Sequence, residues 1–186
     1  MPLRLHYASA IALISAEPED KRLVSARDLA IFSYANIANV IRKVSPYPQE
    51  DRHALFAQMV LNICVHNTDD HLKNFGFLEP QAQAANAHKG LLALSPCFDI
   101  VTQTAMQHYL SIGTRGREGS IENALTQPHY FGLSPKGAKI IAQRVIDVVA
   151  NRRQFYDAAG LSEHDQAYLN ALVETRCLAS HSSKDY

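Results

Sequence analysis

The sequence predicts a mainly α-helical domain with a small β-hairpin beside a polar loop. Apolar residues recur at helical spacing in several long stretches, most clearly over residues 50–66. Two short apolar runs, at 75–78 and 91–95, flank a polar, small-residue connector and have the length of strands. The polar loop, residues 67–74, lies between the clearest helix and the first of these strands.

Length and composition favour one domain with a substantial core. The chain has 186 residues, with 18 Lys and Arg against 18 Asp and Glu, so no overall field attracts nucleic acid or a membrane. Its three cysteines, Cys64, Cys97 and Cys177, are odd in number and widely spaced, which is typical of buried free thiols in a reducing compartment. Residues 1–6 lack the apolar core of a signal peptide, and no run approaches a membrane span. We therefore expect a cytoplasmic location.

The first half of the chain contains two predicted helices. Residues 8–14 are apolar and residues 17–21 are polar and turn-like, which indicates irregular structure or a short helix. Ser33 is expected to cap a helix over 34–44, which Ser45 and the two prolines after it end. The helix over 50–66 carries a wide apolar stripe, formed by Leu55, Phe56, Met59, Val60, Ile63 and Cys64, and suits the middle of a helical lobe.

The second half is predicted to begin with a loop and end with two helices. Residues 102–130 are predicted to be loop-rich, and three glycines at 113, 116 and 119 space out Thr114, Arg115, Arg117 and Glu118. This segment is either an activation-type or substrate loop or a plain surface loop. Ser134 and Pro135 open a helix to about residue 156, whose apolar residues are Ile140, Ile141, Val145, Val148 and Val149.

The last predicted helix covers about residues 163–178. Ala159 and Gly160 end the helix before it, and Ser162 with Asp165 approximates a capping box at its start. Its inward residues should be Tyr168, Leu169, Leu172 and Val173. We expect one domain over 1–178, followed by a disordered tail at 179–186.

The polar loop reads Asn67-Thr68-Asp69-Asp70-His71-Leu72-Lys73-Asn74. Packing does not require so many polar groups at the end of a buried helix. Asp69 and Asn74 have the D-x-x-x-x-N spacing of a protein-kinase catalytic loop, in which the Asp takes the substrate hydroxyl proton and the Asn binds magnesium. Only Asp69 has four residues before Asn74, so Asp70 is expected to face outward or to be a helix-end partner.

A second acid, Asp99, follows the second strand. The chain therefore has the order of a kinase C-lobe, in which an Asp and an Asn of the catalytic loop are followed by a hairpin and then by a metal-binding Asp. The carboxylate of Asp99 and the amide oxygen of Asn74 are hard ligands that suit Mg²⁺. Lys73 can reach a transferring phosphate as a point charge, and His71 can orient the loop or contact phosphate.

The same residues allow two other interpretations. The loop is also compatible with a solvated turn that ends a helix. Alternatively, His66, Asp69, Asp70 and His71 could bind a transition metal for hydrolysis. The remaining histidines show no paired spacing to complete such a site, so we regard the kinase interpretation as the stronger one.

The strings Thr-Asp-Asp-His-Leu-Lys-Asn-Phe and Phe-Asp-Ile resemble the C-terminal domain of HipA-type Ser/Thr kinases, the toxins of bacterial toxin–antitoxin modules. Ser33-Tyr34-Ala35 and Leu110-Ser111-Ile112-Gly113 extend the resemblance, which runs from about Arg4 to the last helix. It implies a kinase-like C-lobe that transfers the ATP γ-phosphate to a Ser or Thr hydroxyl of a protein substrate, with Mg²⁺ as cofactor.

The resemblance also implies roles and partners. Asp69 and Lys73 would be catalytic, His71, Lys73, Asn74 and Asp99 would contact the nucleotide, and Asn74 and Asp99 would bind Mg²⁺. Family members commonly pair with a DNA-binding antitoxin, and their substrates include components of translation such as aminoacyl-tRNA synthetases. Direct nucleic-acid binding by this chain is not indicated.

The nucleotide-binding N-lobe of a kinase is expected to be absent from the chain. The first 50 residues hold no Gly, and neither Lys21 nor Lys43 lies in a Val-Ala-Ile-Lys-like strand. The lobe would then belong to a longer kinase or act in trans as a separate polypeptide. The alternative is a catalytically inactive remnant that serves as a protein-interaction module. An uncovered interlobe face would favour a partner or a homodimer.

Overall fold

The computed structural model describes residues 5–15, 31–80 and 90–177. The predicted turn at 17–21, most of the strand connector and the tail at 179–186 lie outside these residues. The described elements are β1 (Tyr7–Ser9), α1 (Ala10–Ser15), α3 (Tyr34–Val44), α4 (Pro48–Cys64), η1 (Leu72–Asn74), β2 (Gly76–Leu78), β3 (Ala93–Leu94), α5 (Ile121–Ala124), η2 (Pro128–Phe131), α6 (Pro135–Ala150), α7 (Arg153–Ala158) and α8 (Glu163–Cys177). The chain is mainly helical, as predicted.

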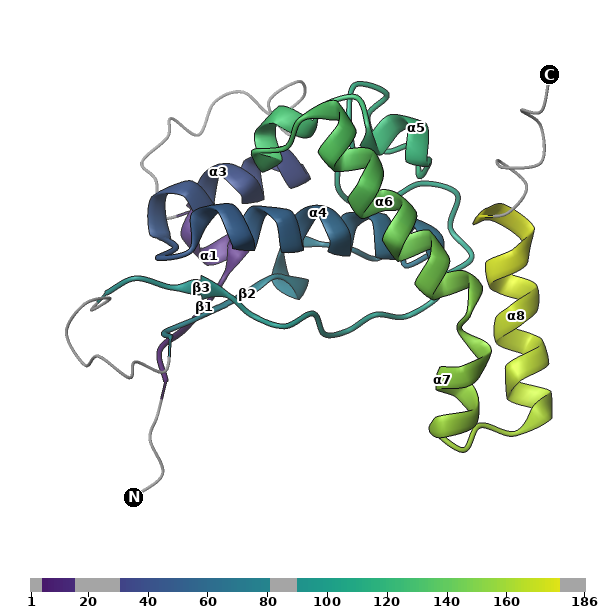
Figure 1. The fold of residues 1–186 in the computed structure, drawn as a ribbon. Helices are drawn as coiled ribbons and strands as arrows, with labels where there is room; N and C mark the ends of the chain where they lie inside the picture. The colour runs from purple at the N-terminus through teal and green to yellow at the C-terminus, as the bar shows by residue number, and fades with distance from the viewer. Residues whose placement is uncertain (1–4, 16–30, 81–89, 178–186) are drawn as a thin grey trace.

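Helix α4 is the centre of the molecule. Its apolar stripe is buried, with Leu55, Phe56 and Met59 fully inaccessible. Helices α3 and α6 are its main neighbours, and the small sheet lies near the other end of the group from α7 and α8 (Figure 1). The helix begins at Pro48, where proline needs no amide partner, and ends at Cys64. It therefore stops two residues before the predicted end, so that the polar loop starts beyond it.

Helix α3 has the predicted bounds, Tyr34–Val44. The Ser33 hydroxyl accepts a hydrogen bond from the Asn36 amide at 3.1 Å, which confirms the predicted N-cap. The amide of Tyr34 donates to the Ser111 carbonyl at 3.1 Å, and the Ser111 amide donates to the Phe32 carbonyl at 2.9 Å. The start of α3 is thereby tied to a segment that follows the candidate site in the sequence.

The sheet has three antiparallel strands in the order β1-β2-β3. The predicted hairpin is confirmed, with Phe77 opposite Leu94. Strand β1, which pairs Ser9 with Gly76, was not predicted. A Cβ at Gly76 would lie 2.8 Å from both the Ser95 hydroxyl oxygen and the Tyr7 ring. Glycine at this position allows the two outer strands to approach the centre of the sheet.

Helix α6 is shorter than predicted. The Ser134 hydroxyl caps it, accepting from the Gly137 amide at 3.1 Å, but the helix ends at Ala150 and a separate helix, α7, follows. Ile140 and Val148 are 53% and 49% exposed, so the predicted apolar face is wrong for these two residues. Val149 is buried as predicted, together with Ala138 and Ala142, whose small side chains allow α6 to pack closely on α4.

Helix α8 begins with the predicted capping box. The Asp165 amide donates to the Ser162 hydroxyl at 3.2 Å, and that hydroxyl donates to the Asp165 carboxylate at 2.7 Å. Val173 is buried as predicted, whereas Tyr168 is 62% exposed and the inward prediction for it is wrong. Helices α7 and α8 lie together beyond the C-terminal end of α6 (Figure 1).

The prediction of buried free thiols is right for Cys64 and wrong for Cys97, which is exposed where the chain leaves β3. The side chain of Cys177 lies outside the described residues. Within the described ranges, no helix combines the length and apolarity that a membrane crossing requires.

Candidate active site

The polar loop is fixed to the structure on both sides. It follows α4 through His66, a non-glycine residue with a φ of 57°, which is a strained backbone conformation. The Asn67 amide donates to the Asn62 carbonyl of α4 at 2.8 Å. On the other side, the Thr68 carbonyl accepts from the Tyr109 amide at 2.9 Å. The loop therefore presents its side chains from a rigid frame.

Asp69 and Asn74 are linked within this frame. The Asn74 side-chain nitrogen donates to the backbone carbonyl of Asp69 at 3.0 Å, which closes the segment between them into a ring. Asn74 is 7% exposed, whereas the Asp69 side chain is exposed. The hydrogen bond leaves the amide oxygen of Asn74 without a hydrogen-bond partner among the described residues. Asp69 can accept a proton, and Asn74 can offer an oxygen ligand.

Asp99 lies at the same end of the sheet as Asn74. Strand β2 begins two residues after Asn74, and the antiparallel partner β3 ends before Asp99. The Ser95 amide donates to the Gly76 carbonyl at 2.8 Å, and the Phe98 ring lies 3.2 Å from the place that a Gly76 Cβ would take. Asp99 is exposed and has a φ of 57°. Such strain in a non-glycine residue is frequent at functional sites.

His71 and Lys73 complete the predicted set on the loop. His71 is half-buried, and its Nδ1 is buried without a hydrogen-bond partner among the described residues. Its ring contacts that of Tyr109 edge-on, with centroids 6.0 Å apart. Lys73 lies exposed on η1, one residue before Asn74. Four of the five predicted site residues thus lie on one rigid loop, and Asp99 is brought to the same sheet end.

Asp70 is fully buried, so the expectation that it faces outward is wrong. One carboxylate oxygen accepts from the Tyr34 hydroxyl at 2.6 Å and from His108 Nδ1 at 3.0 Å. The other accepts from the Tyr109 amide at 2.9 Å and the Leu110 amide at 3.3 Å. Four donors hold this carboxylate, which therefore fastens the loop to both α3 and residues 108–110.

Burial and the neighbouring Asp70 charge raise the pKa of Tyr34 well above its usual value. The phenol therefore stays protonated and donates to Asp70. Asn62 supports the same network, because its side-chain nitrogen donates to the Tyr34 oxygen at 2.9 Å. Sequence reasoning missed Tyr34 and His108 because they lie 36 and 38 residues from Asp70, and no local pattern connects them.

The glycine-spaced segment after the site is organised by one buried residue, Asn123. Its side-chain oxygen accepts from the Arg115 amide at 2.9 Å, and its side-chain nitrogen donates to the carbonyls of Gly116 and Glu118 at 3.1 and 2.8 Å. A Cβ at Gly119 would lie 2.7 Å from the His108 ring. The segment is thus folded onto the residue that bonds Asp70.

The donor set fits a magnesium ion better than a hydrolytic metal. Mg²⁺ prefers oxygen ligands and usually takes one or two from the protein, with phosphate and water supplying the rest. The Asn74 amide oxygen and the Asp99 carboxylate meet that requirement. In contrast, the described residues contain no group of three or more His, Cys, Asp or Glu that could hold a metal ion.

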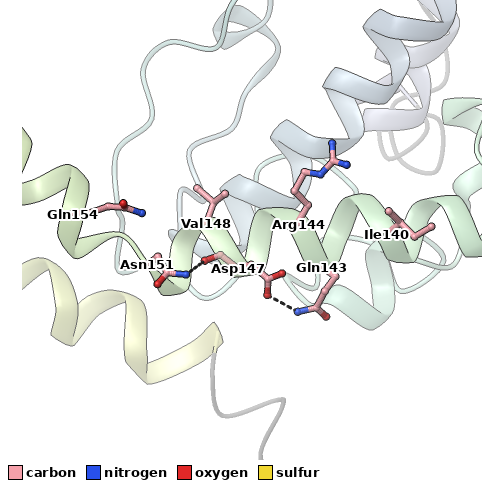
Figure 2. Close-up of a pocket in the computed structure, with 7 residues that line it drawn as sticks. All are labelled: Ile140, Gln143, Arg144, Asp147, Val148, Asn151 and Gln154. Atoms are coloured by element: carbon pink, nitrogen blue, oxygen red, sulfur yellow. Dashed lines mark hydrogen bonds between the residues drawn. The ribbon is translucent and has the colours of Figure 1, made fainter.

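A separate pocket on the outer side of α6, of about 520 Å³, contains none of the predicted site residues. Figure 2 shows its lining, in which the Gln143 side chain donates to the Asp147 carboxylate at 2.8 Å and the Asn151 side chain donates to the Asp147 carbonyl at 2.8 Å. The polar groups there bond one another along the helix, so this pocket is not the candidate active site.

The fold and the loop together define a mainly helical domain whose polar loop is fixed at the edge of a small antiparallel sheet. The HipA-like C-terminal domain family matches residues 2–153, and the chain belongs to this family. The resemblance inferred from the loop is thereby confirmed. No curated protein matches the chain by sequence.

Among solved structures, the chain is similar to HipA in the complex of HipA, HipB and operator DNA from the Shewanella oneidensis MR-1 toxin–antitoxin system. The TM-score is 0.70 at 15% sequence identity, over 95% of this chain and 44% of that chain. This likeness shows a shared fold. The chain spans less than half the length of the protein that it matches.

Proposed function

We propose that this chain is the catalytic C-lobe of a HipA-like protein kinase, which transfers the ATP γ-phosphate to a Ser or Thr hydroxyl. The observation that carries the proposal is the bond from the Asn74 side-chain nitrogen to the Asp69 carbonyl. This bond joins the Asp–Asn pair of a kinase-type loop and leaves the amide oxygen for a metal ligand, while the Asp69 side chain is exposed.

Each loop residue would then have its own role in phosphoryl transfer. Asp69 accepts the proton of the substrate hydroxyl as that oxygen attacks phosphorus. Asn74 and Asp99 would hold Mg²⁺, which when bound neutralises charge between the phosphates. Lys73 supplies a positive charge near the transferring phosphate. The unpartnered Nδ1 of His71 provides a further polar contact there.

A kinase site also needs a nucleotide-gripping lobe, and we propose that a second lobe covers this one. The segment just after Asp99 supports this, because it exposes apolar side chains that a lobe would bury. Val101 is 50% exposed and Met106 is 75% exposed, and Phe98 beside them is 40% exposed. The lobe belongs either to the same longer polypeptide or to a separate chain acting in trans.

We further propose a DNA-binding antitoxin partner and a cytoplasmic location for the complete kinase. The fold neighbour from Shewanella was solved with HipB and operator DNA, which supports an antitoxin partner for a chain of the same family. The protein substrate is not defined by the described residues.

Calorimetric titration of the chain with ATP and Mg²⁺ tests the proposal. We expect binding heat that depends on the metal, an affinity that falls by about tenfold or more in Asp99→Asn, and binding that persists in Asp69→Asn, since of these two aspartates only Asp99 is a proposed metal ligand. In the complete kinase, Asp69→Asn should abolish phosphoryl transfer. Retained transfer in that variant would remove the base assignment.

An inactive interaction module is the second candidate, and the exposed apolar residues after Asp99 also favour it. The two candidates differ in their response to metal. If the chain together with its second lobe gives no metal-dependent heat with ATP, while the folded chain still binds a partner protein through residues 98–106, the interaction module is supported over the catalytic lobe.

A further inference from the structure

A cleft of about 380 Å³ opens beside the Asp69 carboxylate. Its lining includes Thr68, Asp69, Gln103, His108, Tyr109 and Arg117. Asp69 is the single acid in this lining and Arg117 the single arginine or lysine. The cleft is therefore a polar site with one base and one fixed cation.

The cleft lies apart from the residues assigned to metal and phosphate. Lys73, Asn74 and Asp99 do not contribute to its lining, although Asp69 does. In an in-line transfer, the acceptor oxygen and the leaving phosphate lie on opposite sides of the phosphorus atom. A cleft that shares the base with the metal site, and nothing else, suits the acceptor rather than the nucleotide.

Arg117 is held in position but not neutralised. Its carbonyl accepts from the His108 amide at 3.1 Å, and its guanidinium carbon lies 5.7 Å from the centroid of the Tyr109 ring. Its Nε is buried without a hydrogen-bond partner, and no carboxylate pairs with it among the described residues. A buried donor without a partner costs free energy, so an anionic ligand at this position is favoured.

The neighbouring Arg115 shows the contrast. Its guanidinium donates to the Glu118 carboxylate at 3.2 Å, and its side chain is 55% exposed. Arg115 therefore has its anion within the same loop, whereas Arg117 has none among the described residues. Since the two arginines share a segment organised by Asn123, Arg115 provides a matched control.

We propose that the cleft is the acceptor-substrate subsite, and that Arg117 selects protein substrates with an acidic residue beside the phosphorylated Ser or Thr. The inference rests on the proposed kinase function. The acceptor hydroxyl reaches Asp69 while the adjacent carboxylate pairs with Arg117. This pairing also offsets the repulsion that an acidic segment would meet at Asp69.

The test is peptide binding to the full chain, without nucleotide, followed by the amide NMR shifts of residues 103–117. The probes are three capped heptapeptides with a central serine, flanked by two aspartates, two lysines or two alanines. We expect the aspartate peptide to bind about tenfold more tightly than the lysine peptide, with the largest shifts at Gln103, Tyr109 and Arg117.

Variants assign the preference to one residue. Arg117→Gln should remove it, Arg117→Lys should retain part of it, and Arg115→Gln should leave it unchanged. Circular dichroism checks that each variant is folded. Equal binding of the three peptides, no binding of any of them, or the same loss in Arg115→Gln and Arg117→Gln would each overturn the inference.

Failure of this inference and failure of the kinase proposal give different results. Metal-dependent ATP binding without an acidic preference would leave the kinase proposal standing and remove the role of Arg117. An acidic preference lost in Arg117→Gln, in a chain that binds no ATP even with its second lobe, would leave an acidic-peptide site without the kinase function.

Discussion

Two adjacent aspartates, Asp69 and Asp70, differ in their burial and in their hydrogen bonds. The Asp69 side chain is exposed and its carboxylate has no hydrogen-bond donor among the described residues, while Asp70 is fully buried and accepts from four donors. A satisfied buried carboxylate fixes the loop at the position next to the proposed base. The base itself stays available because nothing around it competes for its oxygens.

Substitution to asparagine distinguishes the two roles. Asp70→Asn places an amide NH₂ where a carboxylate oxygen accepted hydrogen bonds, so we expect the free energy of unfolding to fall by about 1–3 kcal/mol. Asp69→Asn, at an exposed position, should change it by less than about 0.5 kcal/mol. Urea denaturation measures both. Equal stability of the two variants would contradict the anchoring role of Asp70.

Tyr34 makes stability depend on alkaline pH. Because burial and then the Asp70 charge raise its pKa, the folded protein keeps the phenol proton at pH values at which the unfolded chain loses it. The contribution is full below about pH 10, the ordinary tyrosine pKa, and is lost as pH rises from there towards the folded-state pKa.

Tyr34→Phe removes this contribution. We expect it to cost about 1 kcal/mol at neutral pH, from the lost hydrogen bond to Asp70, and to flatten the decline of stability above about pH 10. Thermal melts between pH 7 and 11 compare the variant with the native chain, and Tyr168→Phe, at an exposed ring, serves as the control for losing a phenol. If the stability of the native chain, Tyr34→Phe and Tyr168→Phe declined in parallel above about pH 10, the role of Tyr34 would be contradicted.

At the scale of elements, capping residues and apolar spacing predicted the helix ends that are determined by nearby residues. Ser33 located the start of α3, Ser45 with the prolines after it located the end, and Ser134 located the start of α6. The break after Ala150 and the exposure of Ile140 depend on how α6 meets α4, which periodicity does not encode. Strand β1 is three residues long and exists through its pairing with β2, so no local pattern marks it.

The same distinction applies to the candidate site. The spacing of Asp69 and Asn74 is local, and so the sequence alone is enough to predict both as site residues, together with His71 and Lys73 between them. The partners of Asp70 come from α3 and from residues 108–110, brought together only by folding. Arg117 was predicted only as part of a possible substrate loop, because its relation to Asp69 arises from a cleft between distant segments.

The segment that carries Arg117 should depend on Asn123. Asn123→Ala removes three hydrogen bonds to the backbone at 115, 116 and 118, and we expect trypsin to cleave after Arg115 and Arg117 about tenfold faster. Limited proteolysis with mass spectrometry measures the sites. Asn151→Ala, which removes a side-chain bond at the exposed end of α6, should leave this cleavage unchanged. Unaltered cleavage in Asn123→Ala would show that other contacts order the segment.

At the scale of the whole molecule, the fold is shared over nearly the full chain at 15% identity, which is consistent with a framework set by core packing and by a fixed loop rather than by surface residues. The buried stripe of α4 is the centre of that framework, and the loop follows directly from its C-terminal end. The exposed apolar residues after Asp99 lie at the edge of the same site. The proposed second lobe would therefore cover the site and this surface together.

The central claim is that Asn74 and Asp99 form a divalent-cation site beside Asp69, and Mn²⁺ tests it most directly. Mn²⁺ takes the same oxygen ligands as Mg²⁺, and its paramagnetism broadens nearby amide NMR signals even when binding is weak. With Mn²⁺ and ATP, we expect broadening centred on residues 69–74 and on Asp99, and its loss in Asp99→Asn, in which asparagine tolerates the left-handed backbone. Broadening centred elsewhere, such as at Asp147, or unchanged in Asp99→Asn, would contradict the account.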